Sequence, residues 1–179
     1  MFNILFNKKY FLYLIISLIL SYFLVNLSAS KESWYTFWNL LNVPKMWPAF
    51  ADIDFIHRSL VCKFKGYDPT VYNPCDINNT RYQYPIVWLS IFEYLKLDSF
   101  KNFKIFVFFS IFLLFISYFV LLEISKKKFN KIILILLFFS SSSTLLIERG
   151  NIDHIIFILS MATLLSRNYF YETFVIFIN

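Results

Sequence analysis

Apolar runs separated by short charged clusters account for most of this 179-residue chain. A helix needs about 20 apolar residues to cross the roughly 30 Å hydrocarbon core of a bilayer. Residues 85–97 are too few and predict a re-entrant or interfacial helix, while residues 168–179 begin a further apolar segment. The predicted transmembrane helices are 10–28, 103–122, 131–147 and 152–166. The pattern therefore predicts a single all-α membrane domain with several transmembrane helices.

One long polar loop, residues 29–84, interrupts this pattern and holds both cysteines and four of the five prolines. Tryptophans, which favour the membrane–water interface, lie near its start. The sequence predicts two short helices within this polar loop, over residues 33–43 and 52–65. Gly66 is expected to end the second helix, because glycine readily adopts the left-handed conformation common after a helix.

The distribution of lysines predicts the orientation of the chain. Lys8 and Lys9 precede the first apolar run, and the strongest basic cluster lies within residues 126–131. Because positively charged loops stay in the cytoplasm, both clusters are expected inside, with two crossings between them. The polar loop and the charged segment Glu148–Asp153 are then both external. A signal peptide is the alternative for residues 10–28, but its apolar core would be only about 7–15 residues, which favours a retained anchor.

Composition agrees with a membrane environment and narrows the possible partners. Hydrophobic residues make up 59% of the chain, against about 45–50% in globular domains. The net charge of +6 comes from basic residues beside apolar runs, so membrane lipids are expected as partners and nucleic acid is not. Two cysteines without a CxxC pattern and two distant histidines do not indicate a metal site, although a divalent metal stays open. Cys62 and Cys75 could form a disulfide or remain free thiols.

Two acidic residues of the polar loop, Asp52 and Asp54, are candidates for proton transfer. At spacing i, i+2 on a helix they point in different directions, so at most one is expected to face a given pocket. A carboxylate beside the membrane can act as a general base towards an acceptor hydroxyl. A helix N-cap or a solvated loop acid is the alternative for either residue.

A second polar cluster, the segment Glu148–Asp153, interrupts the later apolar runs. Ionisable residues at membrane depth are costly and usually mark a function. Arg149 offers several donors that suit phosphate oxygens, and Gly150 permits backbone conformations closed to other residues. A short external loop held by an ion pair between Arg149 and an acidic neighbour explains the same residues equally well.

Four short stretches stand out by their order along the chain: PAFADIDFI (48–56), KGYDPTVYNP (65–74), RYQYPIVWL (81–89) and ERGNIDHIIFIL (148–159). Together they resemble the bacterial polytopic glycosyltransferases of the GT-C superfamily, in particular family 87. In that family an Asp of the first external loop precedes a glycine-containing turn by about fourteen residues. Asp52 lies 14 residues before Gly66, so the resemblance selects Asp52 rather than Asp54.

The resemblance implies inverting transfer of a sugar from a polyprenyl-phosphate-linked donor to a lipid or glycan acceptor, mannosyltransferase-like and without a cofactor. The active site would lie on the external or periplasmic side of a bacterial inner or plasma membrane. The implied general base is Asp52, with Asp54 as the alternative. The implied substrate-binding residues are Arg149, Asn151, Asp153, Arg81, Tyr84 and His57.

Family members are about twice as long as this chain, so it is expected to represent their N-terminal part, with uncertain activity on its own. Two functions of other classes remain alternatives. The chain could belong to a transporter or channel in which Glu148, Arg149 and Asp153 relay ions, or it could be a non-catalytic membrane component.

Overall fold

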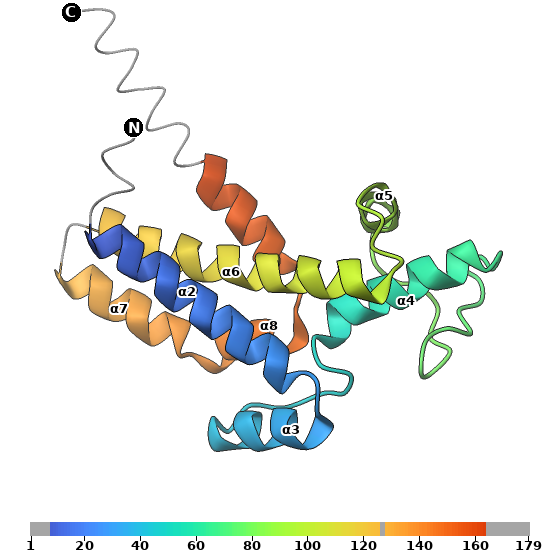
Figure 1. The fold of residues 1–179 in the computed structure, drawn as a ribbon, viewed down its shortest axis with the longest axis horizontal. Helices are drawn as coiled ribbons and strands as arrows, with labels where there is room; N and C mark the ends of the chain where they lie inside the picture. The colour runs from blue at the N-terminus through green and yellow to red at the C-terminus, as the bar shows by residue number, and fades with distance from the viewer. Residues whose placement is uncertain (1–7, 126–127, 164–179) are drawn as a thin grey trace, which may run out of the picture.

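The computed structural model describes residues 8–163 except 126 and 127, and every regular element in that part is an α-helix (Figure 1). The all-α prediction is confirmed for these residues, whereas residues 168–179 lie outside them. The helices are α2 (Lys8–Leu27), α3 (Lys31–Leu40), α4 (Ala51–Phe64), α5 (Ile86–Tyr94), α6 (Phe100–Ile124), α7 (Lys128–Phe138), α8 (Ser141–Arg149) and an unlabelled helix, Asp153–Thr163.

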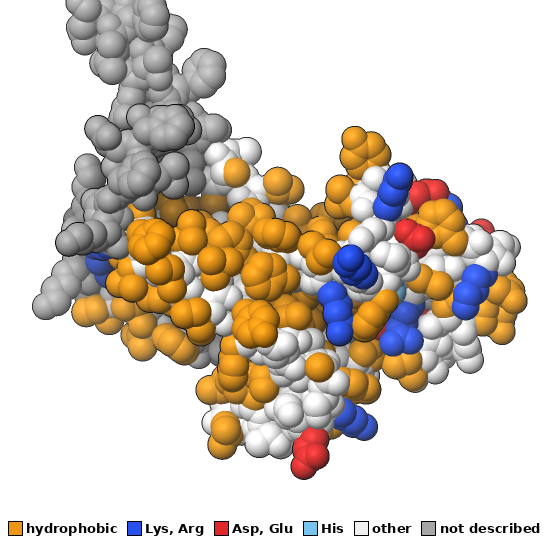
Figure 2. All heavy atoms as spheres, viewed as in Figure 1, with side chains coloured by type: hydrophobic (Ala, Val, Ile, Leu, Met, Phe, Trp, Pro, Cys, Tyr) orange, Lys and Arg blue, Asp and Glu red, His pale blue; other side chains and the backbone are white. Residues whose placement is uncertain are grey.

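The two longest helices, α2 and α6, pack side by side and are each long and apolar enough to cross a membrane. Serines allow a close approach, since Ser17 and Ser21 on α2 are buried and bond to carbonyls of their own helix. Tyr13 stacks on Phe119 with ring centroids 4.7 Å apart. The two helices therefore form the apolar half of the molecule, where hydrophobic side chains gather in Figure 2.

The predicted helix 131–147 is not continuous. The chain forms α7 and α8, which meet at an angle of 46° across a short break, as a broken span or a re-entrant loop. The reason is the serine run that begins at Ser140, whose hydroxyl accepts the Ser143 N–H while both hydroxyls donate to the Leu137 carbonyl. Counting this pair as one span gives three candidate membrane spans in the described residues, and without it two.

Two shorter helices correspond to the remaining predicted segments. Helix α5 occupies the middle of segment 85–97 and is nine residues long, or about 14 Å, too short to cross a bilayer. Helix Asp153–Thr163 covers the described part of the predicted span 152–166. Neither passes the length test that α2 and α6 pass.

The polar loop contains α3 and α4, close to the two predicted short helices. Helix α3 buries one face, because Trp34 and Trp38 are 0% and 2% exposed and Trp34 packs against Phe50 with ring centroids 4.9 Å apart. The C-terminal end of α8 lies against the start of α4. This contact joins the two polar regions that the lysine pattern assigned to one side of the membrane.

Candidate active site

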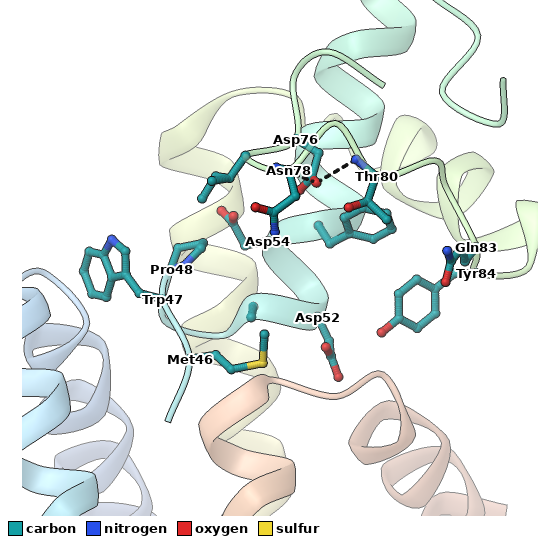
Figure 3. Close-up of a pocket in the computed structure, with 13 residues that line it drawn as sticks. Met46, Trp47, Pro48, Asp52, Asp54, Asp76, Asn78, Thr80, Gln83 and Tyr84 are labelled. Carbon is teal, nitrogen blue, oxygen red and sulfur yellow. Dashed lines mark hydrogen bonds between the residues drawn. The ribbon is translucent and has the colours of Figure 1, made fainter. Parts of the chain in front are cut away.

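A cavity of about 510 Å³ opens beside the start of α4 (Figure 3). Its walls come from the segment before α4, the first turns of α4 and the second half of the polar loop. The residues that line it are Met46, Trp47, Pro48, Ala51, Asp52, Asp54, Phe55, Asp76, Ile77, Asn78, Thr80, Gln83 and Tyr84. Three separate stretches of the polar loop therefore build one cavity.

Both candidate carboxylates border this cavity, so the expectation that only one of Asp52 and Asp54 faces it is wrong. The rule that side chains at i and i+2 point in different directions limits a pocket on the side of a long helix. Here both residues lie in the first turn of α4, and the cavity extends around that end of the helix. The position also favours acidic side chains, because the N-terminal end of a helix carries a partial positive charge.

The two carboxylates differ in their partners. Asp54 forms an ion pair with Arg58 one turn later on α4, and the Asp54 side chain is only 10% exposed. Burial raises the pKa of Asp54, and the hydrogen bond and charge of Arg58 lower it. Of the two candidates, Asp52 is therefore the carboxylate without an ion pair in the described residues, and Asp54 is already occupied by Arg58.

Asp52 has no lysine or arginine bound to it in the described residues, and its surroundings tune its basicity. Burial raises the pKa of Asp52, while the charge of Arg149 and a hydrogen bond with Tyr84 lower it; the charge of Asp153 adds a smaller upward effect. The Tyr84 hydroxyl points towards the Asp52 carboxylate in Figure 3. Burial, followed by the nearby Asp52, raises the pKa of Tyr84 to about 12, so Tyr84 stays a donor at neutral pH.

The segment Glu148–Asp153 packs directly onto the start of α4. Gly150 has φ +59°, and a Cβ atom at this position would lie 2.9 Å from Cβ of Phe50. The Phe50 N–H donates to the Glu148 carbonyl over 3.2 Å. These contacts bring Arg149 and Asp153 close enough to act on the charge of Asp52.

Arg149 is nevertheless absent from the cavity lining. Its Nε atom is buried and has no hydrogen-bond partner among the described residues. Asn151 has a local role, because its side-chain oxygen accepts the Asp153 N–H over 3.0 Å at the start of the next helix. The structure thus brings Asp52, Tyr84, Arg149 and Asp153 into one neighbourhood, with only the first two on the cavity surface.

Two of the expected substrate-binding residues lie elsewhere. His57 is 8% exposed, stacks on Phe103 of α6 at a centroid distance of 4.3 Å and places Nε2 3.3 Å from the Asp98 carbonyl oxygen. Burial lowers the pKa of His57, which keeps the ring neutral in this packing position. Arg81 is exposed and does not line the cavity.

Glu148 is a residue whose position the sequence did not reveal. It is 1% exposed, and its Oε1 accepts the Met46 N–H over 2.6 Å and the Trp34 indole N–H over 3.3 Å. Glu148 therefore anchors the segment that forms one cavity wall to α3. An acidic residue directly after an apolar run was the available signal, but its spacing to Met46 carries no sequence pattern.

The cavity surface mixes apolar and polar side chains, and its charged groups are all acidic. Asp76 accepts the N–H groups of Asn78 and Thr80, each over 3.1 Å, which orders this wall. Among the 13 lining residues no Lys, Arg or His occurs. A neutral, hydroxylated group suits such a surface better than a phosphate, because carboxylates accept hydroxyl protons and repel anions.

A second cavity of about 420 Å³ lies on the other side of Pro48 and Asp54. Arg58 and Lys104 contribute cationic groups to its lining, and Phe103 and Val107 of α6 contribute apolar ones. Because Arg58 is paired with Asp54 in this lining, Lys104 supplies the remaining positive charge, beside a surface from a candidate membrane span.

The described residues contain no group of three or more His, Cys, Asp or Glu side chains placed to hold a metal ion. Comparisons with protein families, curated proteins and solved structures give no match for this chain. The geometry around Asp52 is therefore the main evidence for the function of this chain.

Proposed function

We propose that this chain is a membrane glycosyltransferase of the GT-C type that transfers a sugar from a polyprenyl-phosphate donor to an acceptor hydroxyl, with inversion, at the external face. One observation carries the proposal: Asp52, which has no ion pair among the described residues, lies on the wall of a cavity that shares lining residues with a second cavity bordered by α2 and α6. The donor carries a polar sugar and an apolar lipid chain, so its binding site must offer a polar cavity and an apolar surface within the length of one donor molecule.

In this proposal Asp52 removes the proton of the acceptor hydroxyl as its oxygen attacks the anomeric carbon. The bond from that carbon to the donor phosphate breaks, and the lipid phosphate leaves with the bonding electrons. Burial supports this role, because it raises the pKa of Asp52 and makes the carboxylate a stronger base. Tyr84 holds the carboxylate in place through its hydroxyl.

The sugar and the phosphate of the donor would occupy different surroundings. The hydroxyl groups of the sugar match the polar side chains Asn78, Thr80 and Gln83 of the main cavity. The phosphate requires positive charge, which Lys104 supplies in the second cavity, where Arg58 is already paired with Asp54; Arg149 acts on the charge of Asp52 from outside the main cavity. The polyprenyl chain would follow the apolar helices.

The direct test is transfer by the purified protein in lipid nanodiscs. A polyprenyl-phosphate hexose with a radiolabelled sugar is supplied together with a total lipid and glycan extract as the acceptor pool. We expect label to leave the donor and to appear in a new product. Donor that stays intact and unbound, with acceptors from several bacterial envelopes, would contradict the proposal and favour a non-catalytic or transport role.

The pH dependence tests the contact between Asp52 and Tyr84. The hydrogen bond from Tyr84 lowers the pKa of Asp52, so Tyr84→Phe should raise this pKa. The base is active when deprotonated, and the acid limb of the activity profile should therefore move to higher pH. Tyr82→Phe is the matched control, because the Tyr82 hydroxyl donates to the Pro85 carbonyl over 3.2 Å and does not touch Asp52. Equal shifts in both variants, or a downward shift in Tyr84→Phe, would exclude this contact as the cause.

A further inference from the structure

The last turns of α4 and the middle of the polar loop are held in a defined register. The Asn73 side chain is fully buried, and its Nδ2 donates to Oγ of the equally buried Ser59 over 2.9 Å. Three residues after Ser59 on α4 lies Cys62, and two residues after Asn73 in the loop lies Cys75. Because residues three apart share a helix face, this bond places Cys75 over Cys62.

The two thiols lie close enough for Cys62 to affect the pKa of Cys75. Cys62 is fully buried and Cys75 is partly exposed, and both are free thiols in this structure. Burial, then a hydrogen bond with Cys62, raises the pKa of Cys75 to about 11. The raised pKa keeps the Cys75 thiol mostly protonated and slows its reactions, while its partial exposure lets a reagent reach it.

The cysteine pair adjoins one wall of the main cavity. Asp76, Asn78 and Thr80, which follow Cys75 immediately, form the wall opposite the start of α4. The chain between the two cysteines turns at Gly66, where φ is +87°, and the Tyr67 N–H donates to the Cys62 carbonyl over 3.2 Å. A covalent bond between the sulfurs would therefore tie this cavity wall to α4 through a short closed loop.

We propose that Cys62 and Cys75 form a reversible intramolecular disulfide that fixes the cavity wall when the protein meets a disulfide oxidant. The Cys75 thiolate attacks a sulfur of the oxidant, forms a mixed disulfide and releases one oxidant thiol. The Cys62 thiolate then attacks the Cys75 sulfur and releases the second. The protein loses two electrons and two protons, and the oxidant disulfide gains them as two thiols. This inference is independent of the proposed glycosyl transfer.

The test uses the full chain in nanodiscs, fully reduced and then exposed to glutathione buffers of graded redox potential. Free thiols are alkylated and the digested peptides are identified by mass spectrometry. We expect both cysteines to lose alkylation together, with one peptide pair cross-linked between Cys62 and Cys75 in monomeric protein. The variant Cys62→Ser should instead stop at a Cys75–glutathione adduct.

A second measurement follows the cavity wall itself. Hydrogen exchange of residues 76–84 should slow on oxidation of the wild type and stay unchanged in Cys75→Ser. The proposal is overturned if the folded wild type accumulates the glutathione adduct on Cys75 while Cys62 remains alkylatable after unfolding. It is equally overturned if disulfides form only between molecules, or if oxidation leaves exchange in residues 76–84 unaltered.

Discussion

Replacing Asp52 by asparagine should lower the turnover of sugar transfer by at least about 100-fold, within the range of about 10²–10⁴ that general-base help contributes. Asparagine keeps the shape and most hydrogen bonds of the side chain but cannot accept the proton of the acceptor hydroxyl. Binding of the donor should change little, because the proton is transferred only during reaction. The measurement is initial transfer rate at saturating donor, together with donor affinity.

Asp54→Asn is the matched control, since Asp54 lies on the same cavity and differs by its bond to Arg58. This variant should lose thermal stability, because Arg58 loses its partner, while turnover falls far less than in Asp52→Asn. An active Asp52→Asn beside an inactive but folded Asp54→Asn would show that the base is the other carboxylate.

Gly150→Ala should destabilise the protein by about 2–4 kcal/mol, because it combines backbone strain with a steric clash. The new Cβ would lie 2.9 Å from Cβ and 3.3 Å from Cα of Phe50, and neither Phe50 atom can move without shifting the start of α4. The cavity wall that carries Asp52 would move with it, so transfer activity should fall as well. Thermal unfolding in detergent and the transfer assay measure the two effects.

Gly66→Ala tests the effect of backbone strain without a steric clash. Gly66 also has positive φ, at +87°, but a Cβ atom there would meet nothing within 4 Å. This variant should cost only the backbone strain of about 1–2 kcal/mol and leave the cavity intact. If Gly66→Ala were as damaging as Gly150→Ala, the close packing of Gly150 on Phe50 would not be the cause of the loss.

Sequence patterns predicted the helices well where a single physical requirement dominates. The uncharged runs that became α2 and α6 allow almost no other structure in an apolar solvent, because every backbone polar group must be bonded within the segment. The break at Ser140 was missed, because the uncharged run alone set the bounds of that span, whereas the serine hydroxyls bond to the Leu137 carbonyl and interrupt the helix there.

The candidate site was only partly predictable. Asp52, Asp54 and Tyr84 were named from the sequence and lie on the cavity, whereas His57 and Arg81 lie outside it. His57 shares a helix with Asp52, but residues on one helix point in different directions, and its face packs on α6. Residues such as Asn78 and Gln83 carried no signal, since polar loop residues are common and only the path of the loop brings them to the cavity.

The sequence alone determined that the described part of the chain is helical, that two of the four predicted spans, now α2 and α6, suit a membrane, and that the polar chemistry gathers in two regions far apart along the chain. Hydropathy and local propensity act over neighbouring residues, which is why these features can be read without a structure. Only the tertiary structure decided that Gly150 packs on Phe50, that Glu148 anchors Met46 and that Arg58 neutralises Asp54, while Asp52 has no ion pair within the described part of the chain. Most of those contacts join residues about 100 positions apart, and they depend on how whole helices pack, which no local pattern encodes.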